Sequence, residues 1–86
     1  MNTFKLIISS PEGDIFNDEA VCLSLRGVEG DLAVMAGHIP FVTAVKPGEC
    51  KIEFEDMSEK SGRVDGGILK VSADSVRLLA GSFEWI

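Results

Sequence analysis

The chain has 86 residues, 45% hydrophobic and 26% charged, and its formal net charge is −6 because 14 acidic residues outnumber 8 basic ones. This length and composition predict one domain over residues 1–86 with one modest core. The acidic balance and the lack of a Lys/Arg cluster exclude nucleic-acid binding and disfavour docking to a bare anionic membrane. No run is long enough for a transmembrane helix, and the N-terminal apolar run is too short for a signal peptide. We therefore expect a cytoplasmic chain that does not insert into the membrane.

Apolar residues alternate at a period of two, as in the segment from Phe4 to Ile8, which is typical of β-strands. Turn signals recur about every 8 to 12 residues, the spacing of a small antiparallel sandwich or barrel. No helical periodicity exceeds about two turns. The pattern thus predicts one all-β domain with about ten short strands, at residues 4–9, 14–16, 20–26, 31–35, 41–46, 49–55, 59–65, 67–72, 75–80 and 82–85.

The segment from Gly27 to Phe41 carries three glycines, one proline and the only histidine, His38. Glycine followed by aspartate at Gly30-Asp31 favours a turn, and the next five residues fit a short strand. Pro40 lacks an amide hydrogen and favours extended geometry before it. This segment is therefore predicted to form a turn, a strand and a sharp corner.

Three short segments are apolar on both faces of their predicted strands: Leu6-Ile7-Ile8, Leu78-Leu79-Ala80 and Phe41-Val42. Their outer faces are covered either by a neighbouring loop or strand, or by another subunit, and composition leaves the two alternatives open. The charged hairpin between residues 49 and 63 is interpreted as a solvated face rather than a metal or partner site.

No catalytic or cofactor-binding constellation is found. A single histidine excludes a two-histidine metal site, and no phosphate-binding loop or serine elbow is present. Cys22 and Cys50 are expected to be reduced thiols, buried or half-buried, with at least one of them buried. We therefore predict a protein with no catalytic residues, no cofactor and no metal.

A family resemblance rests on four segments in order: Glu29-Gly30-Asp31, Gly37-His38-Ile39-Pro40, Lys46-Pro47-Gly48, and Gly66-Gly67 with the strand after it. Over residues 4 to 83 the sequence resembles the N-terminal domain of the rotary ATP synthase epsilon subunit, called delta in mitochondria. The resemblance implies a flattened antiparallel β-sandwich of ten strands. It also implies a non-catalytic rotor subunit of the central stalk in a proton- or sodium-driven enzyme.

In that family the domain binds the gamma subunit and rests on the polar loops of the c-ring. The resemblance therefore implies that Glu29 and Asp31 meet the c-ring loops. It implies a peripheral location, at the cytoplasmic face of the bacterial inner membrane. With this resemblance, the three segments that are apolar on both faces indicate a subunit interface. The expected gamma-binding residues are Ser10, His38, Ile39, Phe41 and Val42.

The sequence departs from the family pattern at Asp31, where glutamate is common, and at Ala33 and Ala36, where glycine and proline are frequent. Family members usually continue into two C-terminal helices, whereas this sequence stops at Ile86. Inhibition by those helices and nucleotide binding are therefore not expected of it. The alternative function is a free-standing β-sandwich that binds a small ligand or a partner protein.

Overall fold

The computed structural model describes residues 2–37 and 39–86, which form ten β-strands and no helix. It follows that this part of the chain has no helix able to cross a membrane. The strands are β1 (Phe4–Ser10), β2 (Gly13–Ala20), β3 (Cys22–Gly27), β4 (Gly30–Met35), β5 (Phe41–Val45), β6 (Gly48–Glu53), β7 (Glu59–Val64), β8 (Gly67–Val71), β9 (Ser75–Ala80) and β10 (Phe83–Trp85).

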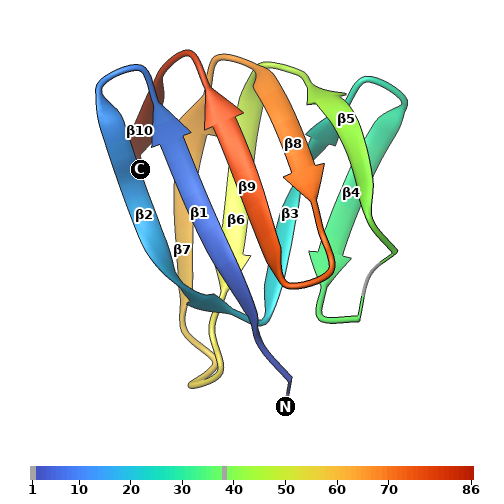
Figure 1. Cartoon of the computed structure of the whole chain (residues 1–86). Helices are drawn as coiled ribbons and strands as arrows, with labels where there is room; N and C mark the ends of the chain where they lie inside the picture. The colour runs from blue at the N-terminus through green and yellow to red at the C-terminus, as the bar shows by residue number, and fades with distance from the viewer. Residues whose placement is uncertain (1, 38) are drawn as a thin grey trace.

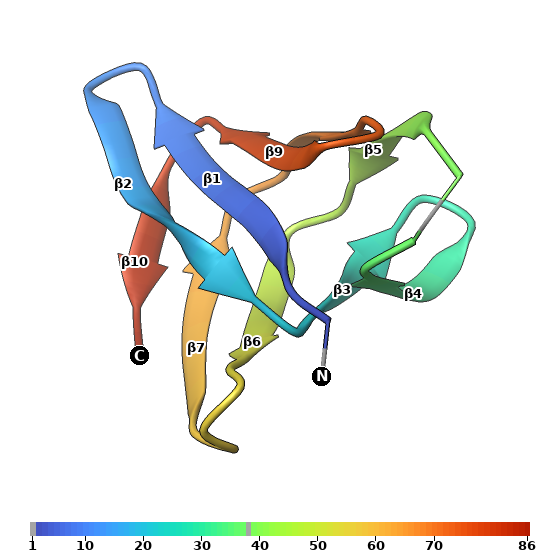
Figure 2. The same ribbon diagram turned by 60° about the horizontal axis from the view of Figure 1, so that its bottom comes forward.

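The strands form two layers that face each other (Figures 1 and 2). One layer has the order β5-β8-β9-β1-β2, and the other has the order β10-β7-β6-β3 with β4 beside β3. The layers join where Gly27 of β3 pairs with Val45 of β5. The predicted all-β sandwich of about ten strands is confirmed.

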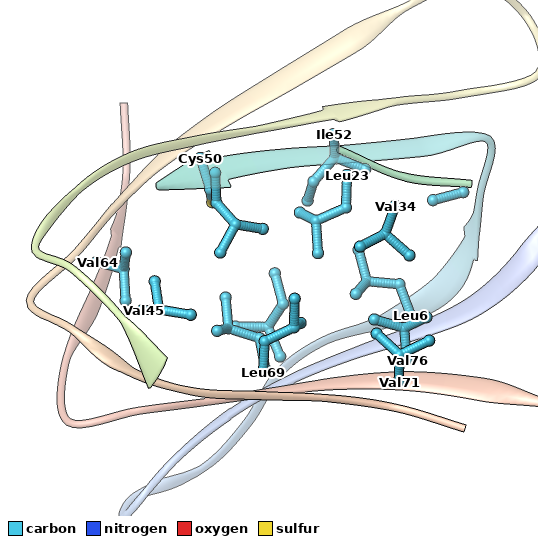
Figure 3. Packing of buried hydrophobic residues seen from close by; sticks show 14 of the residues in the cluster. Leu6, Leu23, Val34, Val45, Cys50, Ile52, Val64, Leu69, Val71 and Val76 are labelled. Atoms are coloured by element: carbon cyan, nitrogen blue, oxygen red, sulfur yellow. The ribbon is translucent and has the colours of Figure 1, made fainter. Parts of the chain in front are cut away.

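The core fills the space between the layers, because every second side chain of each strand points inward. Figure 3 shows Leu69, Val71 and Val76 of one layer opposite Leu23 and Ile52 of the other. Six of the core side chains are large aliphatic groups with no exposed surface: Leu6, Ile8, Leu23, Ile52, Leu69 and Leu78.

The sandwich departs from purely antiparallel pairing at β1 and β9, which run parallel. Figure 1 shows this pairing at the centre of one layer, where β1 and β9 both run upward. The β9 strand pairs with β8 on its other side, in the antiparallel sense.

The prediction of a short strand at residues 14–16 was wrong, because β2 continues to Ala20. Asn and Asp are typical turn residues, which is why the sequence predicts a break at Asn17-Asp18, but these two residues pair with Ile7 and Leu6 of β1. As an edge strand, β2 tolerates polar side chains that point to water, and charges there discourage pairing with another chain.

Aromatic side chains fill the gap between β2 and β10, the two ends of the strand order. The ring of Phe16 lies 6.0 Å from that of Phe54 and 5.9 Å from that of Trp85. Phe83 and Trp85 meet edge to face at 4.8 Å, and the ammonium of Lys60 lies 4.3 Å above Trp85. We call these four rings the aromatic seam. They close the sandwich with side chains where backbone pairing is missing.

Cys22 and Cys50 are free and buried, as predicted. Leu23 pairs with Ile52 across β3 and β6, so Cys50 shares their inward face whereas Cys22 lies on the outer face. The Sγ of Cys22 lies 3.8 Å from the Oγ of Ser24 on that outer face. The two thiols are therefore on opposite sides of one layer.

Candidate functional site

The β5-β8-β9-β1 part of one layer carries apolar residues on its solvent side. Across these strands Ala44 pairs with Ile68 and Ile68 with Leu79, while Val42 occupies the next outward position of β5. Ile7 of β1 faces the same way, because it pairs with Arg77 of β9. We call this set the outer apolar face: Ile7, Val42, Ala44, Ile68 and Leu79.

The exposure of these side chains is high for apolar groups on a sheet. The exposed fraction is 65% for Val42, 49% for Ile68 and 43% for Leu79. Contiguous exposed apolar residues of this kind mark surfaces that bind other proteins. The three segments predicted to be apolar on both faces therefore lie in one layer, and their outward residues Ile7, Val42 and Leu79 share one face.

A hollow of about 390 Å³ lies at one end of the outer apolar face. Ile68 and Leu79 form part of its lining, together with Ser10 at the end of β1 and Pro11 in the turn after it. The buried Ser9 also lines the hollow, and its hydroxyl donates a hydrogen bond of 2.8 Å to Asp14 of β2. The hollow is therefore mainly apolar, with Ser10 as a polar group at its rim.

Two basic side chains lie among these apolar groups. Lys70 of β8 pairs with Arg77 of β9, and Lys70 also pairs with Val42 of β5, so the three form one row. Both basic residues are exposed. The ion pairs found among the described residues, Arg26 with Asp31 and Lys51 with Glu59, lie on the other layer.

The structure brings together some of the predicted gamma-binding residues and separates others. Ser10 and Val42 both belong to the layer that carries the outer apolar face. Phe41 instead turns toward the core and is half-buried. Ile39 lies beyond the far end of β4 and is 81% exposed. His38 lies outside the described residues.

The predicted acidic site is at the turn between β3 and β4. Glu29 is exposed in the turn, and Asp31 is exposed at the second position of β4. The tight turn depends on Gly30, whose φ of 129° is in the region that favours glycine. Asp31 lies 3.6 Å from Nε of Arg26 on the paired strand. Both side chains are largely exposed, so this ion pair is weak and the Asp31 carboxylate can bind another cation in place of Arg26.

The β3–β4 turn lies at the same end of the sandwich as the β1–β2 turn (Figure 1). The six residues of β4 separate it from Gly37 at the other end of the strand by about 20 Å. The acidic turn is therefore an end surface, whereas the outer apolar face is a side surface.

Few ionisable groups are perturbed. Burial raises the pKa of Cys50, with a backbone hydrogen bond acting in the opposite direction, and burial also raises that of Cys22. Hydrogen bonds from Ser58 hold the pKa of the exposed Asp56 carboxyl below its usual range. Within residues 2–37 and 39–86, no cluster of three His, Cys, Asp or Glu side chains could hold a metal ion. A raised pKa disfavours the nucleophilic thiolate at both cysteines.

Sequence reasoning did not select Ile68, Lys70 and Arg77 as site residues. The signal was present, because Ile68 precedes the core residue Leu69 and so makes β8 apolar on both faces. The basic pair could not be found from the sequence, since only the β8–β9 register brings Lys70 and Arg77 side by side.

Comparison with known proteins gives a family and a fold. Residues 3–86 match the family described as ATP synthase, Delta/Epsilon chain, beta-sandwich domain. The structure is similar to a chain of the Euglena gracilis mitochondrial ATP synthase, OSCP/F1/c-ring in rotational state 1. That similarity has a TM-score of 0.91 at 21% identity and covers 96% of this chain and 53% of the other.

A chain of the central stalk/c-ring structure of the Tetrahymena thermophila mitochondrial ATP synthase is also similar. The TM-score is 0.80 at 17% identity, over 95% of this chain and 66% of the other. The chain thus spans about half to two thirds of the length of these two proteins. At these identities the likeness shows the same fold.

Proposed function

The chain belongs to the family of ATP synthase delta/epsilon β-sandwich domains, and from that premise we propose that it is a non-catalytic rotor subunit of the central stalk. In this role it binds the gamma subunit and rests on the c-ring, and it supports the coupling of proton or sodium flow to ATP synthesis. Its place is peripheral, at the cytoplasmic face of a bacterial inner membrane. The observation that carries the proposal is the outer apolar face on a family-matched sandwich.

The outer apolar face is the proposed gamma-binding surface. A joint that transmits torque has to keep many contacts at once, and a paired sheet holds its side chains in fixed positions. Val42, Ile68 and Leu79 would lose their exposed apolar area to such a partner, and Ser10 borders the hollow beside them. Phe41 supports this surface from within the core, and the exposed Ile39, beyond the end of β4, is proposed as a separate contact with gamma.

Glu29 and Asp31 form the proposed contact with the c-ring loops. Their turn lies at one end of the sandwich, so the domain presents this end to the ring and its side to gamma. Basic residues on the c loops would compete with Arg26 for the Asp31 carboxylate. Contacts between exposed charges are worth about 1 kcal/mol or less and weaken with salt.

Co-purification with the gamma subunit of the same organism tests the proposed function. A tagged wild-type chain should retain gamma, whereas Val42→Asp and Ile68→Asp should lose most of it. Met57→Asp is the matched control, because Met57 is 88% exposed but lies at the tip of the β6–β7 hairpin. Failure of the wild-type chain to retain gamma, or equal retention by all variants, would contradict the assignment.

The acidic turn has a separate test in the assembled enzyme. Asp31→Lys should loosen the coupling of ion flow to ATP synthesis and leave gamma binding unchanged, because the two surfaces are distinct. His38→Glu, at a position outside the described residues, is expected to weaken gamma binding instead. If both changes reduced gamma binding equally and neither affected coupling, the division between two partners would be wrong.

A further inference from the structure

The strands β5, β8, β9 and β1 carry basic residues and no acidic ones, although the whole chain has a net charge of −6. The outward positions of β8, β9 and β1 include Lys70, Arg77 and Lys5. The acidic side chains of this layer's strands lie on its edge strand β2, where Asp14 and Glu19 accept hydrogen bonds from Ser9 and Thr3. Lys5 lies opposite Glu19 of β2, whereas Lys70 and Arg77 face no carboxylate on their neighbouring strands. The centre of the layer thus combines apolar groups with an unopposed basic pair.

The Lys70–Arg77 pair has no ion-pair partner among the described residues. Like charges directly opposite each other on neighbouring strands destabilise a sheet. Within residues 2–37 and 39–86 no carboxylate compensates this repulsion. The apolar residues Val42 and Ile7 flank the pair, so a partner surface has to be apolar around its charged groups. An acidic partner would remove the repulsion and gain charge-assisted hydrogen bonds in a partly dry interface.

We propose that Lys70 and Arg77 bind carboxylate groups of the protein that covers the outer apolar face. The inference rests on the proposed function, which makes that protein the gamma subunit, and it specifies the chemistry of the contact. Gamma should present aspartate or glutamate side chains within an otherwise apolar patch. The basic pair then fixes the register of the two surfaces, which apolar contacts alone specify poorly.

A protein partner fits better than an anionic lipid surface. Two or three basic residues on a chain of net charge −6 give little attraction to a membrane. In the row Val42, Lys70, Arg77 and Ile7, the two basic residues lie in the middle and an apolar residue lies at each end. This arrangement suits a rigid partner surface with acidic groups between apolar ones.

The test is the affinity of the chain for gamma at 50 and 300 mM NaCl, measured by titration calorimetry. The variant Lys70→Gln/Arg77→Gln should bind about tenfold more weakly than wild type at 50 mM NaCl. Its affinity should also depend less on salt, because the charged contact is gone. The conservative swap Lys70→Arg/Arg77→Lys keeps both charges and should stay within about threefold of wild type.

The matched control is Lys51→Gln/Arg63→Gln, which removes the same charges from exposed positions of the other layer. It should bind gamma as wild type does. Equal affinity and salt dependence of the Lys70→Gln/Arg77→Gln variant and wild type would overturn the inference while leaving the proposed function intact. Loss of gamma binding by wild type itself would overturn both.

A second arm separates protein from lipid. Vesicles of phosphatidylcholine and phosphatidylserine should not sediment the chain. Sedimentation that disappears in Lys70→Gln/Arg77→Gln would assign the basic pair to lipid and overturn the inference.

Discussion

The carbonyl group of Leu79 on β9 lies so close to the α-carbon of Gly67 on β8 that a β-carbon at Gly67 would overlap it. This contact involves backbone, which cannot rotate away as a side chain can. Gly66 beside it has a different role, since its φ of 110° permits the turn into β8. The two glycines thus position the strand that carries Ile68 and Lys70.

Gly67→Ala is expected to lower the free energy of unfolding by about 2–3 kcal/mol, because β8 and β9 must move apart. Gly81→Ala is the control, since a β-carbon there first meets the carboxylate of Asp65, a side chain that can move, and should cost about 1 kcal/mol or less. Urea denaturation followed by Trp85 fluorescence measures both. Equal stability of the two variants would show that the close approach of Leu79 is not a constraint.

Much of the fold could be predicted because alternation and turn residues are local signals. The strands from residue 59 to 80 were predicted within one residue of their observed bounds. The prediction failed at Asn17-Asp18, where a turn-forming pair lies in an edge strand, and it did not foresee the parallel β1–β9 pairing. Both depend on tertiary neighbours, which local patterns do not contain.

The candidate site was predictable only in part. The two-sided apolar strands indicated an interface, but the sequence could not show that Ile7, Val42 and Leu79 share one face. The internal partner of Asp31 was also unforeseen, because Arg26 reaches it only through the hairpin register.

The aromatic seam predicts a stability effect of Trp85. Trp85→Ala should lower the free energy of unfolding by about 2–3 kcal/mol, since the half-buried indole contacts Phe16, Phe83 and Lys60. Urea denaturation followed by circular dichroism measures the change. Met57→Ala, at an exposed position, should stay within about 0.5 kcal/mol of wild type. A Trp85→Ala variant as stable as this control would show that the seam does not hold the layers together.

The buried thiols predict a loss of stability in alkali. Because the pKa of Cys50 is raised in the folded chain, the unfolded chain releases this proton first as the pH rises. The contribution of the Cys50 thiol to the free energy of unfolding is fully present below about pH 8.5 and decreases above it. Unfolding free energies at pH 7 and pH 10 should therefore differ more in wild type than in Cys50→Ala. An identical difference in both proteins would contradict the role of Cys50.

Met57 at the β6–β7 turn is the one described residue other than glycine with positive φ, at 72°. This conformation costs an L-residue about 1 kcal/mol, whereas glycine adopts it freely. Met57→Gly should therefore raise the free energy of unfolding by about 0.5 kcal/mol, after the entropy that glycine adds to the unfolded chain. Ser58→Gly, with no such strain to relieve, should not be stabilising. A Met57→Gly variant less stable than wild type would show that the turn is not strained.

We expect gamma to cover the outer apolar face while the β3–β4 turn meets the c-ring. Electron cryo-microscopy of the ATP synthase assembled with this chain tests it most directly. We expect density for gamma against Val42, Ile68 and Leu79, and c-ring loops beside Glu29 and Asp31. A map in which the outer apolar face is open to solvent, or in which gamma covers the β6–β7 layer instead, would contradict the account.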